Sequence, residues 1–400
     1  MTAAANRPDL VLIAPVRTPI GKFGGELASL SAVDLGVAAG TACLERAGLA
    51  TDEVDQVVFG HGRQAGTGPN PARQIAHRCG VPDARSAFTI NQACGSGLQA
   101  VFCGARAILL GEAEVVLAGG TESMSNTPYL LPRARWGQRL GHDELVDGMY
   151  RDGFLDPLSE LIMGHTAEEL ADEAHIDRQA ADDWAAGSQQ RCQSARGEGH
   201  FRSEIVPVEV AEHHATSLIE KDEHPRDNVT AESLARLRPA FREDGTVTAG
   251  NASGITDGAA AILVASSSAA DRLGLVPSAR LVDWEVVGVD PRIMGIGPVP
   301  AVKQLLQRRA LSFDEIDLVE LNEAFASQVL ACLAELPFDP SRVNVSGGAI
   351  SLGHPIGCSG TRILVTLLHG MARLGSRRGI VTLCFSGGMG LAALVERDPS

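Results

Sequence analysis

Short apolar runs alternate with longer segments of helical periodicity along this chain. Residues 9–16 (DLVLIAPV) and 114–120 (EVVLAGG) are almost entirely apolar and end in turn residues, a pattern typical of strands buried on both faces. Between them lie helix-length patterns such as residues 32–49 (AVDLGVAAGTACLERAGL). Because strands that alternate with helices form a sheet covered by helices, the pattern predicts an α/β protein.

Two pairs of segments match each other within the chain. Residues 44–60 and 306–322 agree at seven of seventeen positions, and in both a helix end leads through an acidic turn into an apolar strand. Further along, residues 93–101 (ACGSGLQAV) have a counterpart in residues 356–365 (IGCSGTRILV), where Ser-Gly again opens a helix. Two matches in the same order indicate a duplicated unit, so we predict two similar halves.

The middle of the chain follows a different pattern. Residues from about 125 to 250 are rich in Arg, Asp, Glu and His and contain few strand-like runs. Structureless connections of that length are uncommon unless they are functional, so a lid or an assembly role is expected. We predict an N-terminal half at 1–124 plus 252–275, an inserted loop domain at 125–251, and a C-terminal half at 276–400.

Composition narrows the classes of function. The chain has 400 residues and a formal net charge of −15, which argues against general binding to nucleic acids or anionic membranes. No run approaches the roughly 18 apolar residues of a membrane span, and no secretory signal or C-terminal targeting tripeptide is visible. The eight cysteines form no C-x-x-C pair or zinc-finger spacing, so neither a disulfide framework nor a metal site is expected. We expect a cytoplasmic protein with reduced thiols.

One cysteine, Cys94, lies in a turn between a strand-like run and a helical pattern. Residues 86–90 (SAFTI) predict the strand, and residues 98–113 (LQAVFCGARAILLGEA) predict the helix. Cys94 would then lie at a helix N-terminus, where free N–H groups and the helix dipole favour a thiolate. Its small neighbours would leave room for a bulky acyl donor, but they would equally let a helix pack closely around a buried cysteine. Both interpretations remain open from this stretch alone.

Three later segments carry further candidate chemistry. Asn322 follows a strand and precedes a helix, where it could equally serve as a simple N-cap. His354 lies in GGAISLGHPIGCSG, and although a lone histidine is usually structural, these glycines clear space around the imidazole. Cys384 ends an apolar strand at a glycine-rich turn, TLCFSGGMG. The N–H groups of that turn could bind an oxyanion, or the turn could only be closely packed.

Together these segments resemble the thiolase family. NQACGSGLQA, NEAFA, GGAISLGHPIGCSG and CFSGGMG occur in the family's order and spacing, as do RTPIGKFGG near the start and GTVTAGNASGITDGAAA before the second half. Six matching segments make the resemblance specific, and it covers essentially the whole chain. It implies the thiolase fold, in which two similar βα halves stack as α-β-α-β-α layers with a loop domain inserted in the first half.

The resemblance implies an enzyme that reversibly condenses two molecules of acetyl-CoA into acetoacetyl-CoA and CoA. Cys94 would be the nucleophile that takes up the acyl group, His354 would activate it, and Cys384 would be the acid/base toward the second substrate. Asn322 would hold a water that binds the enolate oxygen together with His354. The backbone N–H groups of Cys94 and Ser386 would bind the oxygen of the acyl-enzyme.

The resemblance also supplies the expected contacts with acyl-CoA and CoA. These are Met163, Arg226, Ser253, Gly254, Ala324 and Phe325. Arg226 would lie near the adenine, although a solvated loop charge is an equally good interpretation. No permanently bound cofactor or metal is implied. The segment MSNTPYLLPRARWGQRLGHDEL matches the place where the family forms tetramer contacts, which implies a homotetramer built as a dimer of dimers.

Two positions depart from the family's pattern. Ser386 stands at the first glycine of the last motif, so a backbone donor survives there only if serine can adopt the required φ and ψ. Ile162 stands where short-chain members carry a histidine, which could admit a longer or differently shaped acyl chain. The alternatives are a 3-ketoacyl-CoA thiolase of broader chain length, a ketoacyl synthase, which would lack Cys384, and a non-catalytic acyl-CoA-binding protein.

Overall fold

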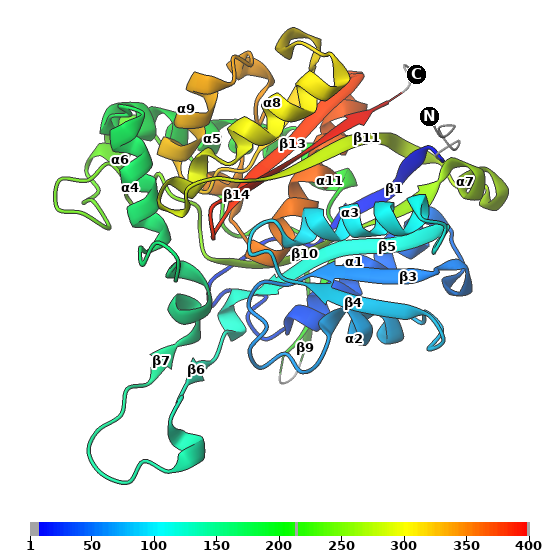
Figure 1. Ribbon diagram of the computed structural model, residues 1–400, viewed down its shortest axis with the longest axis horizontal. Coiled ribbons are helices and arrows are strands. Elements are labelled where there is room, and N and C mark those ends of the chain that lie inside the picture. Colours follow the sequence, from blue (N-terminus) through cyan, green and yellow to red (C-terminus); the bar gives the residue numbers. More distant parts are fainter. Residues whose placement is uncertain (1–7, 213–214, 398–400) are drawn as a thin grey trace, which may run out of the picture.

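The computed structural model describes residues 8–212 and 215–397 (Figure 1). The first seven and the last three residues, on which the expected absence of targeting signals partly rests, lie outside the described residues. Within the described ranges, no helix is long and apolar enough to cross a membrane.

The first half of the chain builds five neighbouring strands. In spatial order they are β4 (Ser86–Ile90), β3 (Gln56–Gly60), β5 (Val115–Ser123), β10 (Thr256–Ser266) and β1 (Leu10–Arg17). β3 runs parallel to β4 and β5, whereas β10 is antiparallel to β5 and β1. The short β2 (Gly21–Lys22) adds to one end of β10. Every residue of β1, β5 and β10 is buried, as the apolar runs predict.

The second half repeats this order. Its strands are β12 (Leu318–Leu321), β13 (Arg378–Phe385), β14 (Met389–Glu396) and β11 (Pro277–Gly288). β12 is parallel to β13, and β14 is antiparallel to β13 and β11. Val343 forms a parallel bridge to Val319 of β12 and so stands where β4 stands in the first half. β1 and β11 pair antiparallel, which joins the two halves into one sheet of ten strands.

Helices form three layers around the two halves of the sheet. The outer face of the first half is covered by α1 (Ala32–Ala47), α2 (Pro71–Arg78) and α7 (Ser267–Leu273). α3 (Ser96–Leu109) and α11 (Ile356–Leu374) share an apolar core with strands of both halves. α8 (Pro298–Arg309) and α9 (Ala326–Glu335) cover the outer face of the second half. This stacking confirms the expected α-β-α-β-α arrangement of two similar halves (Figure 1).

The Ser-Gly pairs that recur in the sequence mark the crossing of α3 and α11. A Cβ on Gly97 of α3 would lie 2.7 Å from Thr361 Oγ1 of α11. A Cβ on Gly360 of α11 would lie 2.5 Å from the backbone N of Leu98 in α3. Each helix therefore needs glycine where it touches the other. This close contact brings the two turns that precede the helices side by side.

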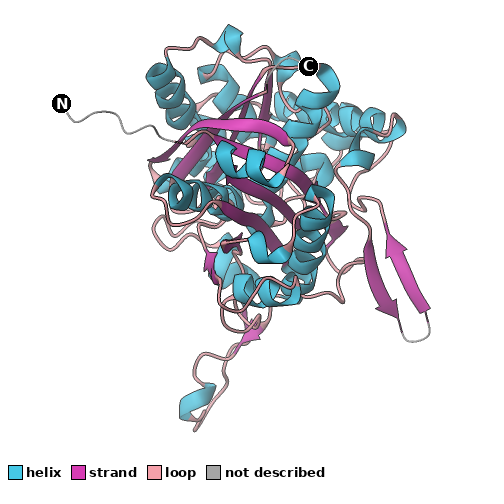
Figure 2. Cartoon of the chain, turned by 90° about the vertical axis from the view of Figure 1, so that its right-hand side faces the viewer, coloured by secondary structure: helices cyan, strands magenta, loops and turns pink. Residues whose placement is uncertain are grey.

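The chain between β5 and β10 stands outside the repeat. It contains α4 (Met163–Glu173), α5 (Arg178–Gly197), α6 (Ala231–Ala235) and two hairpins, β6 (Tyr129–Leu130) with β7 (Val146–Asp147) and β8 (Val208–Glu212) with β9 (Ala215–Ile219). Figure 2 shows both hairpins projecting from the body. α4 and α5 pack against α9, and α5 also packs against α10 (Ala349–Leu352), so this segment reaches the second half. The domain boundaries given above stay a prediction.

Candidate active site

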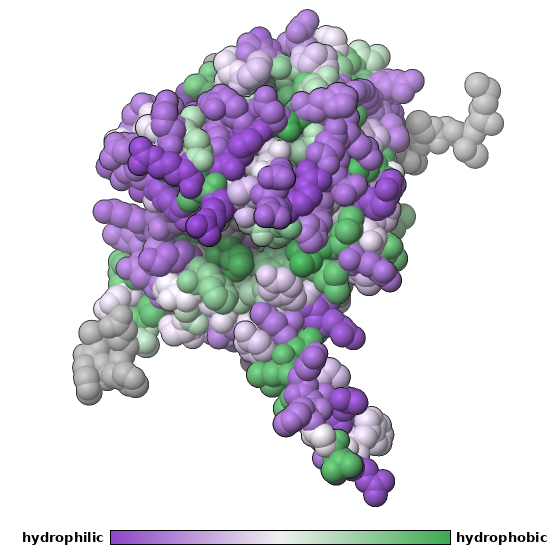
Figure 3. Space-filling view, turned by 90° about the vertical axis from the view of Figure 1, so that its left-hand side faces the viewer, coloured by the Kyte–Doolittle hydropathy of each residue, from purple (hydrophilic) through white to green (hydrophobic). Residues whose placement is uncertain are grey.

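Residues far apart in the sequence line one cavity of about 690 Å³. It lies between the turns that precede α3 and α11, the start of α4, and the loops around residues 223–226 and 252–255. Nine predicted site residues line it: Cys94, Met163, Arg226, Ser253, Gly254, Ala324, Phe325, His354 and Ser386. On the face that carries α4 and α6 the surface is hollowed, with apolar side chains in the hollow and hydrophilic ones around it (Figure 3). Such a cavity suits a small-molecule ligand.

The turn that carries Cys94 is held in a strained conformation by short contacts. Ala93, the residue before Cys94, has a positive φ of +46°. Ser96 braces the turn, because its Oγ accepts from the backbone N of Gln92 (2.8 Å) and donates to the backbone O of Ala93 (2.7 Å). A Cβ on Gly95 would lie 3.0 Å from the ring of Phe385. The small residues thus serve close packing, and they also leave the thiol facing the cavity.

Cys94 and His354 are in direct contact. The Nε2 atom of His354 lies 3.1 Å from Cys94 Sγ. On the other side of the ring, Nδ1 lies 2.6 Å from Ser359 Oγ, which donates its only proton to the backbone O of Pro355 (2.9 Å). The Ser359 hydroxyl must therefore accept from Nδ1–H, and this leaves Nε2 unprotonated toward the thiol. In this geometry Nε2 of His354 can accept a proton from Cys94.

Burial away from water determines the charge state of Cys94 and His354. Burial, reinforced by Arg362 and Arg63, lowers the pKa of His354 to about 3. Burial also raises the pKa of the Cys94 thiol to about 12, against the opposing effect of Arg63. Both groups are therefore neutral at rest. The raised pKa of Cys94 argues against the thiolate expected from the helix N-terminus, because desolvation outweighs the lowering by Arg63 and by the backbone hydrogen bond. The charge must then develop during the reaction.

Cys384 lies near the end of β13, just behind the wall of the cavity. It is 1% exposed and packs in an apolar cluster with Ala324 and Phe325, both of which line the cavity. Burial raises the pKa of its thiol well above the ordinary value, and charge on Cys94 raises it further. The residues that follow the two cysteines in the sequence are in close contact, because a Cβ on Gly95 would lie 3.0 Å from the ring of Phe385. The structure therefore brings both thiols and the imidazole of His354 to one place, although Cys384 does not line the cavity itself.

Asn322 presents a buried amide that no protein group satisfies in the described ranges. It directly follows β12, and its backbone N–H donates to the backbone O of Thr382 in β13 (3.0 Å). Its side chain is 1% exposed, and neither Oδ1 nor Nδ2 finds a partner there. The N-cap interpretation is wrong, because α9 begins only at Ala326 and Phe325 occupies its cap position. An unpaired buried amide costs roughly 1–3 kcal/mol, so the side chain of Asn322 needs a partner such as a water or a ligand atom, although Asn322 is not among the residues that line the cavity.

The turn after β13 accommodates serine without strain. Gly387 (φ +87°) and Gly388 (φ +73°) take the left-handed conformations, whereas Ser386 does not. The substitution of Ser386 for a family glycine therefore leaves the backbone of the turn intact. The N–H of Gly387 donates to a carboxylate oxygen of Asp156 (3.1 Å), which lies in the segment between β5 and β10.

Glu122, which the sequence pattern did not indicate, connects two loops beside the candidate site. This residue of β5 is fully buried, and its carboxylate accepts backbone N–H bonds from Gly62 (3.0 Å), Arg63 (3.1 Å) and Gly357 (2.8 Å). It therefore ties the loop after β3 to the first turn of α11, next to His354. In the sequence, Glu122 is recognisable only as a carboxylate at the end of a buried strand. Its hydrogen-bond partners could not be predicted, because they come from both halves of the chain.

Two family patterns match almost the whole chain. The pattern described as "Thiolase, N-terminal domain" matches residues 10–268, and "Thiolase, C-terminal domain" matches residues 275–397. The chain belongs to the thiolase family. The resemblance drawn from the six sequence motifs is confirmed.

This thiolase is similar to named proteins over its full length. The acetyl-CoA acetyltransferase of Pseudomonas aeruginosa is 49% identical over 391 residues, which cover 98% of this chain and 100% of the relative. The crystal structure of the Bacillus anthracis acetyl-CoA acetyltransferase matches with a TM-score of 0.95 at 45% identity and covers 98% and 99% of the two chains. Human mitochondrial 3-ketoacyl-CoA thiolase in complex with CoA matches with a TM-score of 0.94 at 42% identity over 98% of both chains.

The loop that carries Ser253 and Gly254 connects both parts of the thiolase site. The backbone N of Ser253 donates to the backbone O of Ala324 (3.0 Å), and the backbone N of His354 donates to the backbone O of Gly254 (3.1 Å). Any side chain at Gly254 would overlap the ring of His224. Arg226 is exposed at the rim of the cavity, away from the buried pair.

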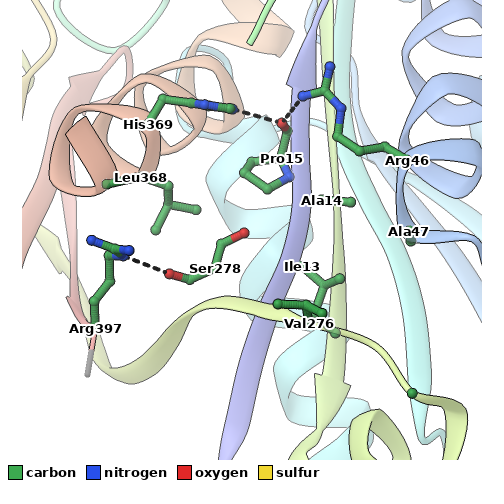
Figure 4. Close-up of a pocket in the computed structure, with 12 residues that line it drawn as sticks. Ile13, Ala14, Pro15, Arg46, Ala47, Val276, Ser278, Leu368, His369 and Arg397 are labelled. Atoms are coloured by element: carbon green, nitrogen blue, oxygen red, sulfur yellow. Dashed lines mark hydrogen bonds between the residues drawn. The ribbon is translucent and has the colours of Figure 1, made fainter. Parts of the chain in front are cut away.

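A second cavity of the thiolase, about 360 Å³ in volume, lies between β1, α1, β11 and α11 (Figure 4). Its polar side chains contact backbone carbonyls: Arg46 and His369 contact the backbone O of Pro15 (3.1 and 3.0 Å), and Arg397 contacts that of Ser278 (3.2 Å). No thiol lines it, so it is not the candidate active site. Across the described ranges, no group of three or more His, Cys, Asp or Glu side chains is placed to hold a metal ion.

Proposed function

We propose that this thiolase reversibly condenses two molecules of acetyl-CoA into acetoacetyl-CoA and CoA through an acyl-cysteine intermediate. The observation that carries the proposal is the 3.1 Å contact between Cys94 Sγ and His354 Nε2, in a cavity backed by the second thiol of Cys384. Full-length similarity to acetyl-CoA acetyltransferases supports the choice of substrate.

In the first half of the cycle, Cys94 takes up the acetyl group. As its sulfur attacks the thioester carbonyl, its proton passes to Nε2 of His354, which Ser359 holds in place through Nδ1. The bond between the carbonyl carbon and the CoA sulfur then breaks. Because burial keeps Cys384 a thiol at rest, Cys384 first acts as the acid and gives its proton to the departing CoA thiolate. The products are acetyl-Cys94, free CoA, a Cys384 thiolate and a protonated His354.

In the second half, the Cys384 thiolate removes a proton from the methyl group of a second acetyl-CoA. The carbanion attacks the carbonyl carbon of acetyl-Cys94 and forms the new carbon–carbon bond. The carbon–sulfur bond to Cys94 breaks, and its sulfur recovers the proton held by His354. Asn322, whose amide has no protein partner in the described ranges, is suited to bind the enolate oxygen through a water, together with His354.

The remaining predicted residues would stabilise the oxyanion or contact CoA. The backbone N–H groups of Cys94 and Ser386 would stabilise the oxyanion of the acyl-enzyme, where losing one donor typically costs roughly 2.7–4 kcal/mol in the barrier. We assign CoA contacts to the cavity residues Met163, Arg226, Ser253, Gly254, Ala324 and Phe325. The relative that is in complex with CoA supports CoA as the ligand.

A second candidate is a 3-ketoacyl-CoA thiolase of broader chain length. Ile162 lines the cavity where a polar residue would favour a small acyl group, and the similarity to human mitochondrial 3-ketoacyl-CoA thiolase also favours it. Cys384 behind the cavity argues against a ketoacyl synthase. The contact between Cys94 and His354 argues against a non-catalytic acyl-CoA-binding protein.

We also propose that the protein is a cytoplasmic homotetramer. The hairpin arm of β6 and β7 carries exposed apolar side chains, including Trp136 (84% exposed) and Leu140 (97% exposed). Apolar groups exposed on a projection are typical of a surface that another subunit covers. The eight cysteines are all free thiols, in keeping with a reducing compartment.

Acyl transfer to Cys94 can be tested directly. Incubation with radiolabelled acetyl-CoA should place label on Cys94, and Cys94→Ala should abolish both labelling and condensation while CoA binding, measured by calorimetry, is retained. Cys103→Ala is the matched control, because Cys103 is a half-buried thiol of α3 outside the cavity. Label on another residue would assign the nucleophile elsewhere.

Thiolysis measured from acetoacetyl-CoA upward to long-chain 3-ketoacyl-CoA decides between the two candidates. The condensing acetyltransferase should lose efficiency steeply beyond the shortest substrate. A flat profile would favour the degradative thiolase.

A further inference from the structure

Arg63 is a buried cation at the cavity that the chemistry proposed above leaves without a role. It is 3% exposed and lines the same cavity as Cys94. Its Nε and Nη2 atoms have no hydrogen-bond partner among the described residues. The buried carboxylate of Glu122 attracts Arg63 electrostatically, but these two nitrogens still lack the hydrogen bonds that offset the cost of burying a charged group. Arg63 therefore needs an explanation beyond the filling of volume.

The contacts of Arg63 converge on the π-helical turn Tyr150–Phe154. Its Nη1 donates to the backbone O of Asp152 (3.1 Å), and its guanidinium carbon lies 5.6 Å from the centre of the Phe154 ring, a cation–π contact. Between these two, the guanidinium lies so close to Gly153 that any Cβ there would overlap it. π-helical turns are rare and occur mostly at functional sites. Three successive residues of this turn, 152–154, thus contact Arg63.

This turn forms the wall of the cavity beside the reacting sulfur. Tyr150, Gly153 and Phe154 line the cavity, and the rings of Tyr150 and Phe154 pack edge to face with centres 5.6 Å apart. Phe154 and Cys94 pack against the same apolar cluster. Just past the turn, Asp156 accepts the N–H of Gly387, the residue after Ser386. The wall is therefore tied on one side by Arg63 and on the other by the turn after β13.

We propose that Arg63 is a positioning residue that holds this turn against Cys94 and thereby limits the length of the acyl group the thiolase accepts. The inference rests on the proposed function and names the part of the site that sets its chain length. An acyl group on Cys94 has to share the space beside the sulfur with Phe154. With Arg63 in place, Phe154 stays there and short acyl groups are favoured. Without it, the turn loses its anchor and longer chains gain room.

The test compares Arg63→Met with Arg151→Met, which removes a charge from the same turn at an exposed position. Thiolysis kcat and KM are measured for acetoacetyl-CoA and 3-ketooctanoyl-CoA. In Arg63→Met, the ratio of kcat/KM for the longer to the shorter substrate should rise about 10-fold or more, mainly through a lower KM for the longer one. Arg63→Lys should give an intermediate ratio, because lysine retains the charge but lacks the planar fork, and Arg151→Met should leave the ratio unchanged.

A second variant keeps the inference open to refutation if Arg63→Met fails to fold. Gly153→Ala displaces the guanidinium from the other side of the same contact and should raise the ratio in the same direction. An unchanged ratio in a folded Arg63→Met, or in Gly153→Ala when the first variant is unfolded, would overturn the inference. If the wild-type protein itself cleaved no 3-ketoacyl-CoA, the proposed function would fail instead, so the two failures are distinguishable.

Discussion

At the scale of single residues, solvent access decides what Cys94 and His354 can do. A helix N-terminus favours a thiolate, yet the surroundings of Cys94 raise the pKa of its thiol to about 12 and lower that of His354 to about 3. A neutral pair avoids the cost of holding two charges in a dry site before substrate arrives. The proton moves only when the substrate carbonyl can share the developing charge.

The pH dependence of alkylation tests this neutral pair. Because the raised pKa of Cys94 lies far above neutrality, its thiolate fraction should grow about tenfold per pH unit from roughly pH 7 to pH 10. The rate of Cys94 modification by iodoacetamide, followed by mass spectrometry, should rise over that interval without a plateau. Cys94→Ala provides the background from the other seven cysteines. A plateau beginning below about pH 8 would indicate a thiolate–imidazolium pair and contradict the assignment.

Ser359 is expected to act on the rate through the orientation of His354. Ser359→Ala leaves Nδ1–H without its acceptor, so the imidazole is no longer held with Nε2 toward Cys94. We expect kcat to fall on the order of 10²-fold with little change in KM, as a small misplacement of a base does. Ser351→Ala is the control, because Ser351 is equally buried in the preceding helix α10 but does not contact His354. Steady-state kinetics in which both variants match the wild type would exclude this role.

At the scale of elements, the site depends on how closely two equivalent helices approach. α3 follows the Cys94 turn and α11 follows the His354 turn, at matching positions of the two halves. Gly97 and Gly360 allow the helices to touch. The distance between sulfur and imidazole is therefore set by helix packing.

Gly97→Ala should separate the two helices. The new Cβ would lie 2.7 Å from Thr361 Oγ1 and 2.9 Å from the backbone O of Gly357, so α3 or α11 must shift. We expect a loss of about 1–3 kcal/mol in the free energy of unfolding, measured with urea, together with a lower kcat. Gly197→Ala is the matched helical control, because a Cβ there meets nothing within 4 Å. Equal stability and activity of the two variants would contradict the packing argument.

At the scale of the whole molecule, the two halves share one sheet while the segment between β5 and β10 reaches outward. The arm of β6 and β7 projects from the body and exposes large apolar side chains (Figures 1 and 3). An isolated surface of this kind carries a solubility cost unless another chain covers it. In the proposed tetramer, another subunit would cover this surface.

The double variant Trp136→Ser with Leu140→Ser should weaken assembly without altering the cavity. Both side chains lie on the arm, outside the cavity lining, and are 84% and 97% exposed. If the wild type is the proposed dimer of dimers, light scattering should then give half its mass, because the contacts of the arm are lost while the other dimer interface remains. A wild-type protein that scatters as a monomer, or a variant with unchanged mass, would refute the role of the arm.

The candidate catalytic residues were more predictable from sequence than their surroundings and charge state were. The motifs around Cys94 and His354 indicated chemistry, and both residues line one cavity at contact distance. Nothing in the motif CFSGGMG indicated that Cys384 would lie behind that wall, or that serine at position 386 would avoid the left-handed region that its glycine neighbours occupy. Those properties depend on what the other half of the chain packs around each turn.

The order of residues alone determined the two halves, the buried strands and the turns that carry the chemistry. Short-range features of the sequence predict them: apolar periodicity, glycines at turns and a repeated Ser-Gly pair at the start of a helix. Only the folded chain decided that the thiol and imidazole are neutral, that the amide of Asn322 is unpaired, and that Arg63 supports the wall beside Cys94. Desolvation and hydrogen-bond satisfaction depend on every group within a few ångströms, and those groups come from segments hundreds of positions apart.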